Sequence, residues 1–248
     1  MKIALLHMDL AWNSPAENIR RADALASAQR CNLYVLPEMW ATGFVVEPEG
    51  VVDDESRSEA LAWMKRFAHE HQCALSGSLA VRVADGSYRN RHYFVTPDDC
   101  IFYDKHHLFT HGGEHHRYTA GRQAVTAQWQ GYGFMLQTCY DLRFPVFARY
   151  GRAGNTYDVL IYVASWPASR QLAWDTLIRA RAIENQCYVL AVNRVGSDPQ
   201  TSYQGGSAIV DPLGRTLGEG CCVADVNLQE LPLLRSRFRV LDDRDEGC

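Results

Sequence analysis

The sequence is organised around the stretch GFMLQTCYDLRFP, residues 133–145. Its apolar beginning predicts a buried strand, and Pro145, a residue suited to the first turn of a helix, predicts a short helix after that strand. Cys139 falls at the connection between the two. A thiol there lies near unpaired backbone N–H groups and the positive end of the helix dipole, which favour a thiolate. The stretch therefore predicts a nucleophilic cysteine, although free cysteine more often acts as a small buried hydrophobe.

Two other polar residues follow predicted strands in the same way. Glu38 comes after the apolar strand 33–36, and the largely apolar residues 39–44 would partly desolvate its carboxylate. Lys105 directly follows a strand predicted over residues 101–103. Each residue could instead be solvated at the surface, where most glutamates and lysines lie. The flanking stretches decide between these readings.

The three stretches, in this order, resemble the glutamate, lysine and cysteine signatures of the nitrilase superfamily of carbon–nitrogen hydrolases. They are LPEM (36–39), YDKHHLF (103–109) and CYDLRFP (139–145). Four further stretches are similar to the omega-amidase branch: TGF (42–44), SWP (165–167), RARAIENQ (179–186) and NRVG (193–196). The resemblance runs from about Lys2 to Asp245, which implies a single carbon–nitrogen hydrolase domain over residues 1–248.

Strands and helices alternate along the chain, with hairpins between them, which indicates an α/β fold with a mixed arrangement of sheets. Helix N-termini are predicted at Ser14, followed by Pro15, and at Ser56, with Glu59 three residues later. The first of these helices should run to about Gln29. The resemblance implies more, namely a four-layer αββα sandwich that commonly pairs through one helical face, so a homodimer or a higher homo-oligomer is expected.

Composition narrows the classes of function. With 248 residues, of which 47% are hydrophobic, the chain can bury a sizeable core. The net charge is −4 without a long run of either sign, so we expect neither nucleic acid nor a membrane as a partner. The eight cysteines lie in a chain far longer than disulfide-dense scaffolds, so reduced thiols and a cytoplasmic location are expected. The apolar run at residues 3–6 is too short for a signal peptide.

Five histidines crowd one segment, so a metal site is an alternative that has to be weighed. They are His106, His107, His111, His115 and His116. Gly112 and Gly113 disfavour a continuous helix there, and no H-E-x-x-H pattern is present. A polar loop at the mouth of a pocket is the favoured interpretation, and no metal ligand is predicted.

The resemblance implies a role for each residue of the predicted site. Cys139 attacks an amide carbonyl while Glu38 takes and later returns the proton, and Lys105 with the backbone N–H of Tyr140 holds the oxyanion. Lys105 is also expected to lower the pKa of the thiol. Glu114 matches a second glutamate of the superfamily and would orient Lys105 or the substrate. A thioester forms and water releases the acid, so neither a metal nor an organic cofactor is needed.

The omega-amidase features imply a small amide as substrate, a dicarboxylic monoamide such as 2-oxoglutaramate. Its distal carboxylate would bind an arginine, for which Arg143 is the candidate nearest the nucleophile, although Arg143 could equally form an ion pair with Asp141 or another acid. Phe44, Tyr140 and Trp166 are predicted pocket walls. Three alternatives stay open: another activity of the superfamily (aliphatic amidase, N-carbamoyl amidohydrolase or nitrilase), a catalytically silent binding protein, and a metal-dependent hydrolase that uses the histidine loop.

Overall fold

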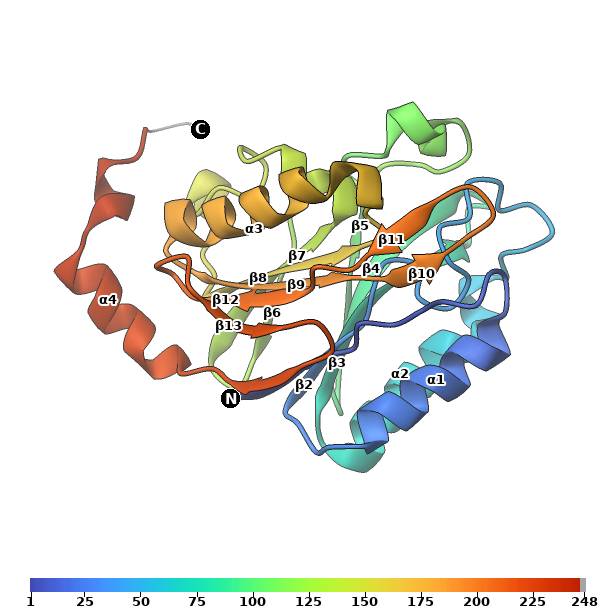
Figure 1. Ribbon diagram of the computed structural model, residues 1–248, viewed down its shortest axis with the longest axis horizontal. Helices are drawn as coiled ribbons and strands as arrows, with labels where there is room; N and C mark the ends of the chain where they lie inside the picture. The colour runs from blue at the N-terminus through green and yellow to red at the C-terminus, as the bar shows by residue number, and fades with distance from the viewer. Residues whose placement is uncertain (246–248) are drawn as a thin grey trace.

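Two six-stranded β-sheets form the centre of the protein in the computed structural model, which describes residues 1–245 (Figure 1). The first sheet has the order β14-β1-β2-β3-β4-β5 and the second the order β13-β12-β9-β8-β7-β6. The strands of the first sheet are β1 (Lys2–Leu5), β2 (Leu33–Val35), β3 (Ala74–Arg82), β4 (Tyr88–Val95), β5 (Cys100–Asp104) and β14 (Val223–Asp225). Those of the second are β6 (Thr126–Trp129), β7 (Tyr132–Thr138), β8 (Val159–Ala164), β9 (Tyr188–Asn193), β12 (Ala208–Val210) and β13 (Thr216–Glu219). A separate hairpin consists of β10 (Val195–Ser197) and β11 (Ser202–Gln204).

Helices cover the outer face of each sheet. The helices α1 (Pro15–Ser27) and α2 (Glu59–His71) lie together on one side of the paired sheets, and α3 (Gln171–Asn185) lies on the other side (Figure 1). A short helix, α4 (Leu231–Arg237), follows near the C-terminus. One apolar core joins the facing sides of the two sheets, and a further core packs under each helical layer. The predicted α/β class and four-layer αββα sandwich are therefore confirmed.

The carboxyl ends of the parallel strands β7, β8 and β9 lie side by side. Thr138, the last residue of β7, pairs in register with Val163 of β8, and Val163 pairs with Val192 of β9. Every residue of β8 and β9 is buried, as expected for parallel strands covered on both faces. Residues that follow these strands at their carboxyl ends consequently meet at one edge of the sheet.

Two predicted helix starts differ in detail from the structure. Helix α1 begins at Pro15, but the side chain of Ser14 makes no capping hydrogen bond, and the helix ends at Ser27. Helix α2 is capped by Ser58, whose Oγ accepts the N–H of Leu61 at 3.2 Å. The predicted cap Ser56 is wrong, because that residue lies in a preceding 3₁₀ turn.

The helix predicted after Cys139 is also different. A five-residue 3₁₀ helix, η4 (Cys139–Arg143), begins at the cysteine itself, and no α-helix begins at Pro145. Phe144 has φ −119° and ψ 83°, away from the helical region, because the ring of a following proline disfavours that region. Pro145 therefore ends the helical turn. Among residues 1–245, no helix is long and apolar enough to cross a membrane.

Candidate active site

The predicted residues Glu38, Lys105, Glu114 and Cys139 meet between the two sheets. Glu38 follows β2 and Lys105 follows β5, both in the first sheet, whereas Cys139 follows β7 of the second. The side chains of Glu38, Lys105 and Glu114 are completely buried. The structure therefore brings together residues that are far apart in the sequence.

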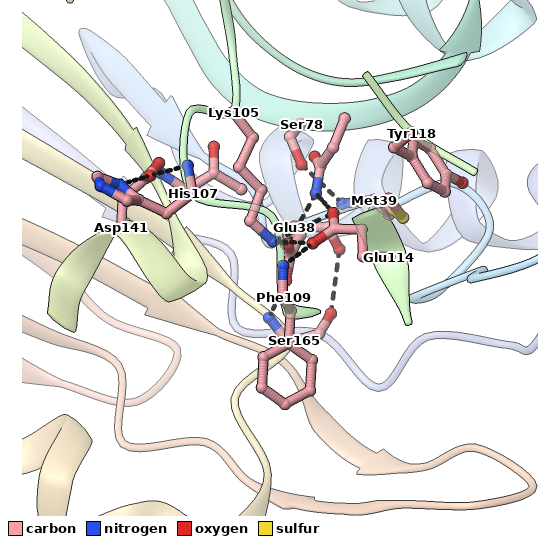
Figure 2. Close-up of polar contacts among 12 residues, drawn as sticks. Glu38, Met39, Ser78, Lys105, His107, Phe109, Glu114, Tyr118, Asp141 and Ser165 are labelled. Atoms are coloured by element: carbon pink, nitrogen blue, oxygen red, sulfur yellow. Dashed lines mark hydrogen bonds and ion pairs between the residues drawn. The ribbon is translucent and has the colours of Figure 1, made fainter. Parts of the chain in front are cut away.

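The ammonium group of Lys105 lies between two carboxylates (Figure 2). Its Nζ donates to Glu38 Oε1 at 2.8 Å and to Glu114 Oε2 at 2.8 Å. The Nδ2 of Asn90 donates to both carboxylates as well, at 2.8 Å to Glu38 Oε1 and at 2.9 Å to Glu114 Oε1. Asn90 was not predicted from the sequence, because it lies between Arg89 and Arg91 in β4 and no local pattern distinguishes it from these polar neighbours.

Backbone groups complete the support of the two carboxylates. The N–H of Ser165 donates to Glu38 Oε2 at 2.9 Å, and the Ser165 hydroxyl donates to the Glu38 carbonyl oxygen at 3.3 Å. The N–H of Phe109 donates to Glu114 Oε2 at 2.6 Å. Ser165 directly follows β8, so the second sheet fixes a carboxylate that belongs to the first.

The electrostatics of the cluster keep Lys105 charged. Burial lowers the pKa of Lys105, but the carboxylates of Glu114 and Glu38 outweigh burial and raise that pKa above its ordinary value. Burial raises the pKa of Glu114, and the ammonium of Lys105 opposes that shift. Lys105 is thus a buried cation that the side chains of Glu38 and Glu114 hold in place.

Cys139 has an unusual backbone conformation and a thiol with a raised pKa. Its φ is 45°, in the left-handed region that residues other than glycine rarely adopt. Burial raises the pKa of its thiol well above the ordinary value, the charge of Glu38 raises it further, and Lys105 lowers it only in part. Lys105 thus acts in the predicted direction, but burial and Glu38 outweigh it, so the net pKa of the thiol is raised and not lowered.

A cavity of about 610 Å³ opens above Cys139. Of the four residues at the centre of the site, only Cys139 lines this cavity, which is within the usual size range of small-ligand sites. The four predicted substrate-binding residues all line the cavity: Phe44, Tyr140, Arg143 and Trp166. Several other wall residues were not predicted from the sequence, among them Trp12, Arg170 and Tyr203.

Arg143 is available to a ligand rather than paired with Asp141. Its guanidinium carbon lies 4.9 Å from the centre of the Trp166 ring. Among the described residues, the ion pair within 4 Å that Asp141 does form is with His107, at 2.8 Å, and Arg143 forms none. The structure therefore removes the predicted ion pair with Asp141.

Two histidines of the loop after Lys105, His106 and His107, form hydrogen bonds with other groups of the protein. The ring of His106 bonds the carbonyl oxygen of Gly121 at 2.7 Å and stacks on Phe147 at 4.1 Å. Within residues 1–245, no three or more histidine, cysteine, aspartate or glutamate side chains are grouped so that they could hold a metal ion.

Comparisons with known proteins agree with this geometry. The family model described as carbon-nitrogen hydrolase matches residues 2–235. A Yersinia enterocolitica protein named Omega-amidase YafV is 40% identical over 255 residues, which cover 99% of this chain and 97% of that protein. A 2-oxoglutaramate amidase of Bacillus subtilis is 35% identical over 251 residues, which cover 97% of this chain and 96% of that protein.

Solved structures show the same fold. A Xanthomonas campestris protein, described as a CN-hydrolase superfamily protein with an arsenic adduct in the active site, is 37% identical with a TM-score of 0.93 and coverage of 99% of this chain and 97% of that chain. A carbon-nitrogen hydrolase of Helicobacter pylori, 22% identical, has a TM-score of 0.86 and coverage of 98% and 94%. The chain therefore belongs to the carbon–nitrogen hydrolase family, the nitrilase superfamily, and is an amidase-type hydrolase. Its curated relatives place it in the omega-amidase branch, as the sequence predicted.

Proposed function

We propose that this protein hydrolyses the terminal amide of a small dicarboxylic monoamide of the 2-oxoglutaramate type, through a thioester on Cys139. The observation that carries the proposal is the buried cluster of Glu38, Lys105 and Glu114 beside a thiol at the base of a cavity. The names of the relatives, omega-amidase and 2-oxoglutaramate amidase, support the choice of substrate.

The first step joins the sulfur to the substrate. The protonated thiol lies in the field of the Glu38 carboxylate, so its proton can pass to Glu38 while the sulfur attacks the amide carbonyl carbon. The carbonyl oxygen takes up the electron pair, and Lys105 stabilises the negative charge. The backbone N–H of Tyr140 adds a second donor, since the first N–H groups of a helical turn have no partner within that turn.

The second step releases ammonia and then the acid. As the tetrahedral intermediate collapses, the C–N bond breaks and Glu38 returns its proton to the leaving nitrogen. A water molecule then loses a proton to Glu38 and attacks the thioester carbonyl. The C–S bond breaks, the thiol of Cys139 regains its proton, and the carboxylic acid leaves. Lys105 stays protonated throughout, which its raised pKa supports.

Recognition of the distal carboxylate is the task we propose for Arg143. Its guanidinium lies over Trp166 in the cavity wall, and a guanidinium can bind a carboxylate through two parallel hydrogen bonds. Phe44 and Tyr140 supply apolar and aromatic wall on which the short carbon chain can pack.

Ammonia release from 2-oxoglutaramate, succinamate, glutamine and a simple nitrile tests the proposal. We expect turnover of 2-oxoglutaramate and succinamate by the unmodified enzyme, no turnover by Cys139→Ala, and near-normal turnover by Cys73→Ala. Cys73 is the matched control because it is also a buried free thiol but does not line the cavity. Activity in Cys139→Ala would rule out the thioester route, and a preference for the nitrile would assign another activity of the superfamily.

We also propose that the protein is a homodimer that works in the cytoplasm. All seven cysteines among residues 1–245 are free, which fits a compartment that keeps thiols reduced. Two large apolar side chains, Leu172 and Ile183, are exposed on the outer face of α3, where a second copy could cover them.

A further inference from the structure

The carboxylate of Asp141 lies two residues after the proposed nucleophile and is completely buried. Its Oδ1 accepts the backbone N–H of His107 at 2.9 Å and lies 2.8 Å from the His107 Nδ1 (Figure 2). Its Oδ2 accepts the hydroxyl of Tyr103 at 2.8 Å and the N–H of Thr138 at 2.9 Å. An ionised carboxylate only accepts hydrogen bonds, so the ring of His107 donates through Nδ1. The two oxygens thus receive four donors.

These donors belong to segments of both sheets. Tyr103 and His107 are two residues to either side of Lys105, in the segment that leaves the first sheet. Thr138 ends β7 of the second sheet and directly precedes Cys139. Asp141 therefore joins the segment that carries the lysine to the turn that carries the sulfur.

Neighbouring contacts stiffen this junction. The hydroxyl of Tyr103 also accepts the N–H of His106 at 2.9 Å. The His107 ring stacks on Phe144 with ring centres 4.0 Å apart and an angle of 10° between the planes. Phe144 follows the same 3₁₀ turn as Asp141, so the imidazole is fixed to the turn by both contacts.

The backbone conformation of Cys139 is one reason why the turn needs the support of these contacts. A left-handed conformation at a residue other than glycine is maintained only where its surroundings determine it. In addition, Lys105 can stabilise an oxyanion only if its ammonium and the sulfur keep a fixed separation, and these two groups belong to different sheets.

We propose that Asp141 is a positioning residue, whose carboxylate fixes the segment around Lys105 against the turn of Cys139. The proposal rests on the proposed role of Cys139 and Lys105 in amide hydrolysis, and it assigns to Asp141 no contact with substrate. His107 and Tyr103 act with it as the donors on the lysine side.

The Asp141→Asn variant tests the proposal, because an amide keeps the shape but turns an NH₂ group toward two of the donors. We expect kcat to fall by about 100-fold, the effect of a displacement of about 1 Å in a reacting group, while KM stays nearly unchanged. Methyl vinyl sulfone, a neutral Michael acceptor that contains no amide, should also alkylate Cys139 more slowly in the variant, because a displaced Lys105 no longer lowers the thiol pKa. Mass spectrometry of the labelled peptide measures this rate without any amide substrate.

Asp211→Asn is the matched control. Asp211 is a buried aspartate that likewise organises a turn: its Oδ1 accepts the N–H groups of Leu213 and Arg215, both at 2.9 Å, and its Oδ2 accepts the Nε of Arg215 at 2.7 Å. It does not line the cavity. We expect Asp211→Asn to lower Tm by about as much as Asp141→Asn does, and to leave both kcat and the alkylation rate of Cys139 unchanged.

Tyr103→Phe is a milder variant that removes one of the four donors and keeps the ring. We expect the kcat of this variant to lie between that of the unmodified enzyme and that of Asp141→Asn. An Asp141→Asn protein with unchanged kcat and alkylation rate would overturn the proposal, as would equal losses in Asp211→Asn. If Asp141→Asn does not fold, an unchanged Tyr103→Phe overturns it instead. If the unmodified enzyme hydrolyses no monoamide, the proposed function fails, and the alkylation rates still test the positioning.

Discussion

At the scale of single residues, the sulfur of Cys139 experiences two opposite charges at once. Glu38 raises the pKa of the thiol, and Lys105 lowers it. A neutral thiol next to a carboxylate is suited to transfer its proton as the sulfur attacks, so the mechanism that we propose uses Glu38 as a general base and needs no preformed thiolate.

The opposing effects lead to a prediction for Glu38→Gln. Removal of the carboxylate charge leaves Lys105 unopposed by Glu38, so the thiol pKa should fall and alkylation of Cys139 near neutral pH should become faster. Amide hydrolysis should be lost in the same variant, because no group accepts the thiol proton. Parallel assays of alkylation by mass spectrometry and of ammonia release check this. Slower alkylation in Glu38→Gln would contradict the assignment of charges.

At the scale of elements, helix α2 begins with a side-chain cap, whereas α1 does not. The hydroxyl of Ser58 accepts the N–H of Leu61, and Ser14 makes no equivalent bond. We expect Ser58→Ala to lower the free energy of unfolding by about 1 kcal/mol, the usual loss for an N-cap. Ser14→Ala is the control and should change stability little. Urea unfolding of both variants measures the difference, and equal losses would show that the cap contributes nothing.

His92 connects strands of both sheets and makes the fold sensitive to acid. On β4, its ring bonds Ser76 Oγ of β3 at 2.7 Å and the carbonyl oxygen of Gln137 on β7 at 3.1 Å. Burial lowers the pKa of His92 to about 3, whereas an unfolded histidine titrates near pH 6.5. As the pH falls below that value, the unfolded chain gains a proton that the folded protein does not, so stability is lost.

This linkage predicts a difference between the unmodified protein and His92→Gln. Between about pH 7 and about pH 5, the histidine should lower the free energy of unfolding by roughly 2 kcal/mol. His92→Gln cannot titrate there, so its unfolding free energy should fall by about that much less over the same interval. Chemical unfolding of both proteins at the two pH values measures this, and parallel losses would be evidence against the buried neutral imidazole.

At the scale of the whole molecule, the outer face of α3 is the surface that the proposed homodimer would cover. Leu172 is 81% exposed and Ile183 is 51% exposed, and eleven residues are about three helical turns, so both lie on one face. We expect a dimer by sedimentation velocity and a monomer for the double variant Leu172→Glu/Ile183→Glu. Leu25→Glu on α1, where the leucine is 37% exposed, is the control and should remain dimeric. A monomeric unmodified protein would refute the assembly.

Local patterns in the sequence predicted the α/β class and most of the strands, but not the hairpin of β10 and β11. The sandwich and the grouping of Glu38, Lys105, Glu114 and Cys139 were expected only from the family resemblance. The sequence did not predict Asn90 or the four donors to Asp141, since these contacts cross between strands or sheets and leave no local pattern. The thiol pKa was mispredicted for a similar reason: how deeply a side chain is buried depends on the packing of the complete fold. The prediction of an α-helix after Cys139 was wrong because Pro145 was assigned to a helix start, whereas in the structure it ends a 3₁₀ turn.

The complete burial of Glu38, Lys105 and Glu114 has a consequence for how the enzyme responds to dissolved ions. Counter-ions screen charges that reach the solvent, over about 8–10 Å at physiological ionic strength, and screen enclosed charges much less. Added salt should therefore weaken the attraction between the exposed guanidinium of Arg143 and an anionic amide, and leave the bond-breaking steps nearly untouched. The affinity for the substrate would therefore depend on the salt concentration, whereas the rate of the chemical steps would depend on it little.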